Sequence, residues 1–233
     1  MNNTRGARVW EIDFFRGIAL VLMVFFHLLF DLKELYGYPV QYNSGIYFYI
    51  GKVSVILFIL VAAVSSTFSR NNTRRAVKIL AAALLISVVS HLYNPIFGIK
   101  FGILHFLGTS ILLFPLFRKL NKYLLAILGT VIIAAGQYLN SVSVEHNYLF
   151  IFNLTSSPWV SADFYPLFPW FGVFLYGIAL GKLLYPNRKS LFRYTPRRNL
   201  LCFIGRHTLP VYLIHQPLLL LVVGIYVKLG KMM

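Results

Sequence analysis

The chain has 233 residues, of which 58% are hydrophobic and only 12% are charged, and its mean hydropathy is +0.72. Soluble domains carry about a quarter charged residues, so this composition excludes an ordinary water-soluble protein. The net charge of +16 would suggest a nucleic-acid partner in a soluble chain, but basic residues flank membrane spans and set their orientation. We therefore expect a single-domain protein of the lipid bilayer that binds no nucleic acid. The one cysteine, Cys202, excludes an intrachain disulfide and a cysteine-based metal site.

Seven apolar runs have the length of a membrane span and alternate with polar or basic segments. Each has roughly 16–23 residues, near the ~20 that cross ~30 Å of hydrocarbon. The runs lie at about 14–32, 46–68, 76–93, 102–117, 123–140, 167–185 and 208–227. The sequence thus predicts an all-α membrane protein, a bundle of about seven transmembrane helices forming one domain over residues 1–233. The fourth and fifth spans are the shortest.

Lys and Arg are distributed unevenly between alternate loops. With the N-terminus in the cytoplasm, seventeen of the 22 Lys and Arg residues fall on the inner side and five on the outer side. Because basic residues accumulate on the cytoplasmic side, this bias predicts a cytoplasmic N-terminus and a C-terminus outside. The long outer loop, about 141–166, has no Lys or Arg and is expected to form a structured lid.

The first span holds most of the ionisable residues found inside spans, where such residues are costly and usually face a cavity or a partner. At 100° per residue, Arg16 and His27 share one face and lie roughly 16 Å apart along the helix axis. Asp13 precedes Arg16 by three residues and Asp31 follows His27 by four, and both are neighbour spacings. One stripe is therefore predicted to carry an ion pair near its inner end and a His/carboxylate pair near its outer end.

Other polar residues are expected in or beside the later spans. They are His91, His105, Asp163 and, near the middle of the seventh span, His215. We expect the first three of these to converge with His27 and Asp31 in the outer half of the bundle, because all five would then avoid contact with lipid. For each histidine the plainer interpretation is a buried, hydrogen-bonded packing residue. No short-range ligand spacing supports a metal site, and no metal is expected.

Four stretches of the chain resemble one enzyme family. Residues 10–27, WEIDFFRGIALVLMVFFH, resemble the first-helix signature of the heparan-α-glucosaminide N-acetyltransferase catalytic-domain family. Residues 101–108, 163–172 and 205–217 resemble its prokaryotic members, so the resemblance runs from the first span to the last. The Arg16-x10-His27 spacing is also that of the wider superfamily of transmembrane sugar acyltransferases, in which both residues are essential.

The resemblance implies a multi-pass acetyltransferase of a prokaryotic cell membrane. It would use cytosolic acetyl-CoA and modify an amine or hydroxyl of an acceptor sugar at or beyond the outer face. His27 is then the general base or the acetyl acceptor. Asp31 or Asp163 would orient its ring, and His105 would polarise the thioester carbonyl or hold the acceptor. The animal enzyme has Asn at the position of His27 and its catalytic His in the next loop, which lacks His here.

Basic residues at the inner ends of the spans suit the phosphates of CoA. They are Arg70, Arg74, Arg75, Lys78, Arg197, Arg198 and Arg206. Arg74, Arg75 and Arg206 are the candidates for acetyl-CoA binding, with Arg16 beside the pantetheine arm. The alternative function is a small proton-coupled transporter that uses the same His/Asp stripe. The absence of an internal repeat disfavours it. A homodimer and the length of the donor acyl chain stay open.

Overall fold

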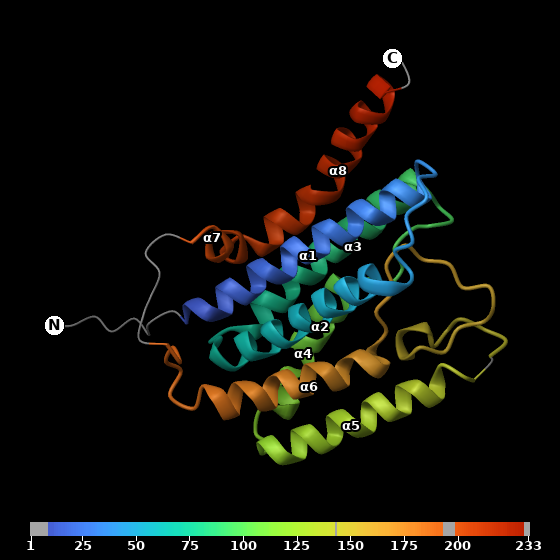
Figure 1. Ribbon diagram of the computed structural model, residues 1–233. Helices are drawn as coiled ribbons and strands as arrows, with labels where there is room; N and C mark the ends of the chain where they lie inside the picture. Colours follow the sequence, from blue (N-terminus) through green and yellow to red (C-terminus); the bar gives the residue numbers. More distant parts are fainter. Residues whose placement is uncertain (1–8, 143, 193–198, 231–233) are drawn as a thin grey trace. The chain divides into compact units, whose positions relative to one another are not determined.

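The computed structural model describes residues 9–142, 144–192 and 199–230 and divides the chain into two compact units (Figure 1). The first unit combines residues 1–58 with 192–233, and the second comprises residues 59–191. Helices account for nearly all of the regular structure in the described residues, which confirms the predicted all-α class.

Every predicted span corresponds to a helix. The spans are α1 (Trp10–Glu34), α2 (Gly45–Phe68), α3 (Asn72–Tyr93), α4 (Ile103–Phe117), α5 (Lys122–Leu139), α6 (Leu167–Leu184) and α8 (Thr208–Gly230). Six of them are long and apolar enough to cross a membrane, and α4 is the shorter seventh. The orientation of the bundle in the membrane stays a prediction. One further helix, α7 (Leu200–Arg206), lies in the polar segment between the predicted spans 167–185 and 208–227.

The first unit contains α1, the first part of α2, α7 and α8. Figure 1 shows α7 and α8, in red, running beside α1, in blue. Two glycines allow α1 and α7 to approach: a Cβ on Gly17 would overlap the Leu201 carbonyl, and one on Gly205 would overlap the Asp13 carbonyl. Asn199 caps α7 by accepting a hydrogen bond from the Cys202 amide at 3.1 Å. These contacts hold the polar start of α1 against α7.

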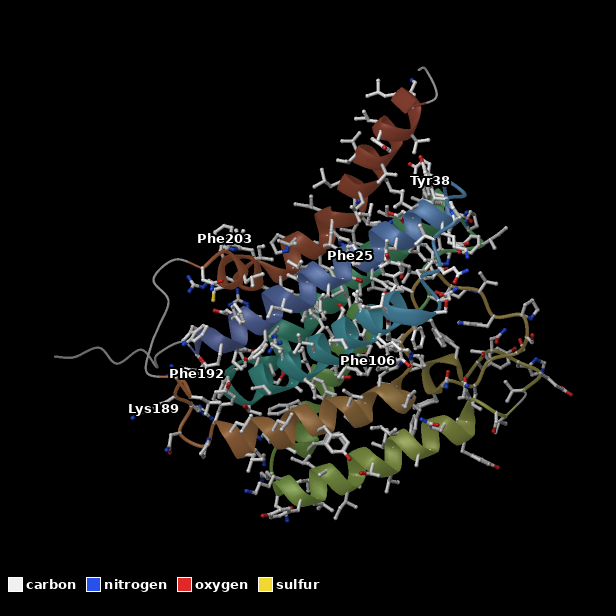
Figure 2. The ribbon with its side chains drawn as sticks, in the orientation of Figure 1. Phe25, Tyr38, Phe106, Lys189, Phe192 and Phe203 are labelled. Atoms are coloured by element: carbon white, nitrogen blue, oxygen red, sulfur yellow. The ribbon has the colours of Figure 1, made fainter. Side chains whose placement is uncertain are left out.

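The second unit contains the end of α2, α3 to α6 and the loop between α5 and α6. In this unit α5 lies alongside α6, and α3 packs against α4 (Figure 1). Two small residues of α6, Gly177 and Gly181, face α2, since a Cβ on Gly177 would come within 2.5 Å of Ala63. Phe106 and Phe174 are fully buried in the core, and Phe106 is labelled in Figure 2.

The loop of residues 141–166 carries the short 3-10 helix η1 (Phe150–Phe152) and is held by aromatic rings. Phe150 stacks on Trp159 with the ring centroids 5.4 Å apart, and Trp159 packs against Phe164. Lys100 donates a hydrogen bond to the Val160 carbonyl at 2.9 Å, and its ammonium lies 4.3 Å from the Trp159 ring centroid. The loop is therefore structured, as predicted, and is fastened to the segment before α4.

Candidate active site

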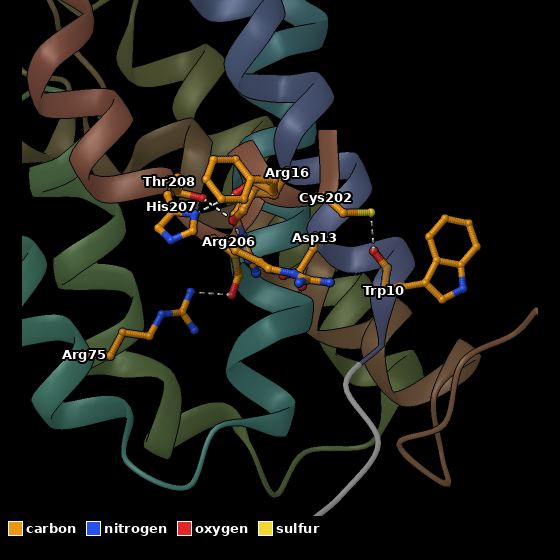
Figure 3. Close-up of polar contacts among 11 residues, drawn as sticks. Trp10, Asp13, Arg16, Arg75, Cys202, Arg206, His207 and Thr208 are labelled. Carbon is orange, nitrogen blue, oxygen red and sulfur yellow. Dashed lines mark hydrogen bonds and ion pairs between the residues drawn. The ribbon is translucent and has the colours of Figure 1, made fainter. Parts of the chain in front are cut away.

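Two arginines meet one carboxylate where α1 begins beside α7, and Figure 3 shows this group. Arg16 donates a hydrogen bond to the Asp13 carboxylate at 3.0 Å, as the i,i+3 spacing predicts, and a second one to the Gly205 carbonyl at 3.1 Å. The Nε atom of Arg206 lies 3.5 Å from the other Asp13 oxygen. We call Asp13, Arg16 and Arg206 the Asp13 cluster. It joins α1 to α7 and explains why a charged carboxylate can be buried there.

The second polar group of the first unit lies farther along α1, against α8. The His27 ring lies 5.1 Å from the His215 ring, measured between centroids. Asp31 is fully buried, and the Gln216 side-chain amide donates hydrogen bonds to both of its oxygens at 2.8 and 2.9 Å. We call these four residues the His27 cluster. The spacing argument paired Asp31 with His27, whereas its carboxylate is bound by α8.

The sequence analysis located His215 near the middle of the seventh span without assigning it a role, and it did not identify Gln216. The signal was present, because two adjacent polar residues interrupt the long apolar run of α8. A polar residue inside a span is a functional candidate by default. What the sequence could not show is that His215 lies against a residue 188 positions earlier in the chain. The His27 ring itself makes no hydrogen bond within the described residues; its contacts there are with the rings of Phe26 and His215.

His105, in the second unit, binds the chain around it through both ring nitrogens. Its Nδ1 accepts a hydrogen bond from the Gly102 amide at 3.3 Å, at the start of α4. Its Nε2 lies 3.3 Å from the Ser87 hydroxyl, which itself donates to the Ile99 carbonyl at 2.6 Å. Since Ser87 has a single proton, Nε2 carries hydrogen and donates to it. A neutral His105 therefore fixes α4 to α3 in this structure.

Asp163 lies at the same end of α4 and accepts a hydrogen bond from the Ile103 amide at 2.8 Å. A carboxylate at a helix N-terminus satisfies an amide that has no partner within the helix. Desolvation raises the pKa of Asp163 to about 6, although the Ile103 hydrogen bond acts in the opposite direction. Burial, and then the nearby Asp163 carboxylate, raise the pKa of Tyr165 above its usual range. The His105 and Asp163 side chains are thus brought together at one helix end.

The remaining candidates have separate places. The Nδ1 atom of His91 lies 2.8 Å from the Ser87 carbonyl, one turn earlier in α3. Arg74 and Arg75 lie in the first turn of α3, where Arg75 reaches the Ala62 carbonyl at 3.4 Å. Arg197 and Arg198 lie outside the described residues. His27 and Asp31 belong to the first unit and His91, His105 and Asp163 to the second, so convergence of all five stays a prediction.

One protein family matches a range of the chain that includes both the Asp13 cluster and the His27 cluster. The family described as heparan-alpha-glucosaminide N-acetyltransferase, catalytic, matches residues 8–217, which is most of the chain. This chain belongs to that family. The protein is accordingly a membrane acetyltransferase, of a family that uses acetyl-CoA as its acyl donor. Neither the curated proteins nor the solved structures give a match. The matched range begins before Asp13 and ends just after Gln216.

Proposed function

We propose that this acetyltransferase moves the acetyl group of cytosolic acetyl-CoA to an amine or hydroxyl of a sugar at or beyond the outer membrane face. His27 is the proposed general base or acetyl acceptor. The observation that carries the proposal is the continuous helix α1, which holds Arg16 and His27 on one stripe and places His27 beside His215. An imidazole without a hydrogen-bond partner inside a family-matched membrane helix suits proton or acyl transfer.

The chemistry needs only one base if transfer is direct. The acceptor nitrogen or oxygen attacks the thioester carbonyl carbon, a C–N or C–O bond forms and the C–S bond breaks. His27 removes the proton of the nucleophile and returns it to the departing CoA sulfur. In the two-step form His27 attacks first, releases CoA and carries the acetyl group until the acceptor displaces it.

The donor end of the proposed site is the Asp13 cluster. Guanidinium groups bind phosphate oxygens in pairs, and Arg16 and Arg206 are held next to each other by a shared carboxylate. Arg206 is about half exposed, at 47%, so its charge is accessible to a ligand in water. Arg74 and Arg75 are proposed as further contacts for CoA. The pantetheine arm would then follow α1 from Arg16 towards His27, over roughly 16 Å of helix axis.

The other site residues are proposed as positioning groups. Asp31 holds the Gln216 amide and so fixes α8 beside His27, which orients the ring indirectly. His105 and Asp163 both bind backbone amides at the start of α4. We propose that these hydrogen bonds hold the acceptor side of the site in place. Their exchange should therefore reduce the rate less than exchange of His27.

Acetyl transfer by the protein in liposomes, with acetyl-CoA supplied on one side, tests the proposal. His27→Ala should lower the rate by about 10²–10⁴, the usual contribution of a general base. His207→Ala is the matched control, because this exposed ring contacts Phe203, one turn earlier, through the Phe203 carbonyl and ring. Arg16→Ala should chiefly raise the KM for acetyl-CoA. Turnover retained in a folded His27→Ala protein would refute the central role, and solute uptake without CoA binding would favour a transporter.

A further inference from the structure

Two consecutive residues of α8 each have a buried polar atom with no hydrogen-bond partner within the described residues. The atoms are Nε2 of His215 and Oε1 of Gln216, and both residues belong to the His27 cluster. His215 is 7% exposed, so bulk water has little access to its ring as a hydrogen-bond partner. Buried polar atoms in native proteins are nearly always hydrogen-bonded, and an exception needs a reason such as a role in catalysis.

Both atoms are hydrogen-bond acceptors. His215 Nδ1 contacts the Tyr212 carbonyl, which can only accept, so Nδ1 carries the ring proton and Nε2 of the neutral ring has a lone pair. The Gln216 nitrogen faces both oxygens of Asp31, and a carboxylate likewise only accepts. The amide therefore cannot be flipped without losing two hydrogen bonds, and Oε1 is the atom left over. A ligand that completes this pair must bring N–H or O–H groups.

We propose that His215 Nε2 and Gln216 Oε1 form the subsite that binds the amine or hydroxyl hydrogens of the acceptor sugar. This inference rests on the proposed function and deepens it by naming two residues that hold the nucleophile. The acetyl thioester has a carbonyl oxygen and no hydrogen to give, so the pair does not suit the reacting group of the donor. A nucleophile held at His215 Nε2 lies close to His27, because the two rings are 5.1 Å apart.

His215→Asn is the sharpest variant. An asparagine nitrogen reaches about as far as Nδ1 and keeps the contact with the Tyr212 carbonyl, while the Nε2 acceptor is lost. His215→Gln extends farther and returns an amide oxygen near the lost position. Ile214→Ala, at the neighbouring position of α8 that is 61% exposed, is the matched control. Thermal unfolding of each purified variant shows whether the fold survives.

The probe is a methyl glucosaminide, with methyl glucoside as its hydroxyl counterpart, and its binding is measured calorimetrically without acetyl-CoA and kinetically with it. His215→Asn should weaken probe binding and raise its KM by roughly ten-fold, the effect of one lost buried hydrogen bond. His215→Gln should recover most of that loss, and the KM for acetyl-CoA should change by less than about two-fold.

Three results would each overturn the subsite. They are unchanged probe affinity in His215→Asn, no probe binding by the unaltered protein, and an effect of His215→Asn on acetyl-CoA alone. The last result would mean that the pair binds an amide of the pantetheine arm. Failure of the proposed function looks different. In that case the unaltered protein binds the probe through His215 but transfers no acetyl group to it.

Discussion

Replacing Asp13 by Asn removes the negative charge that Arg16 and Arg206 share at the junction of α1 and α7. Asn keeps an oxygen that can accept from Arg16, but the bond changes from charge-assisted to neutral. That change costs roughly 1–2 kcal/mol, because hydrogen bonds to charged groups contribute about 1.5–3 kcal/mol and neutral ones about 1 kcal/mol. Arg206 is 47% exposed, so its weaker contact adds less than about 1 kcal/mol.

The expected total is therefore about 2 kcal/mol of unfolding free energy. For a chain of this size that corresponds to a fall in Tm of about 4–8 °C. The assay is thermal unfolding of the detergent-solubilised protein, followed by tryptophan fluorescence. Glu34→Gln is the matched control because it makes the same change of charge at the other end of α1, on an exposed side chain that accepts from Tyr42.

Glu34→Gln should shift Tm by no more than about 2 °C, since exposed contacts contribute little. A Tm of Asp13→Asn equal to that of Glu34→Gln would refute the reasoning. It would show that the close approach of Gly17 and Gly205 holds α1 to α7 without help from the ion pairs.

Two further predictions concern the second unit. Asp163 has a pKa of about 6 in the folded protein against 3.8 for the free side chain, so the folded state binds more protons between these values. The stability that this group contributes should fall by up to about 3 kcal/mol as the pH rises from 4 to 6. In thermal unfolding measured at several pH values, Asp163→Asn should reduce the fall of Tm over this range. A larger fall of Tm in the variant would contradict this. Lys100→Met should raise proteinase K cleavage within residues 141–166 roughly five-fold, for about 1 kcal/mol of lost contacts. Equal cleavage of Lys100→Met and Lys228→Met would contradict it.

The spans were predictable because nearly every residue that crosses the hydrocarbon core has to be apolar. The apolar run 14–32 became α1, and the helix extends beyond the run at both ends. Glu11 and Asp13 in its first turn and Lys33 in its last turn have charges that favour a helix dipole, so hydropathy underestimates its length. Helix α7 begins with five apolar residues, LLCFI, but its seven residues are too few for a membrane span, so the search for spans passed over it. Its second signal was Asn199, which caps the helix.

The candidate site was only half predictable. The pairing of Asp13 with Arg16 follows from helix geometry, and the structure confirms it. The partners of Asp31 and Asp163 lie 185 and 60 residues away in the chain, and no local pattern specifies such contacts. His105 illustrates the same limit, because a polar residue at a helix start can serve as a cap or as a catalyst, and only its hydrogen bonds show which one it can be.

The shortness of α4 has a consequence for the bilayer around it. Its 15 residues rise about 22 Å, some 8 Å less than the hydrocarbon thickness that a spanning helix has to match. A span this short is matched by local thinning of the bilayer, which brings headgroups and water closer to the ends of the helix. At the start of α4 the amides of Gly102 and Ile103 already have protein partners, the His105 ring and the Asp163 carboxylate. We therefore expect the bilayer to be thinner around α4 than around the longer helices of the bundle.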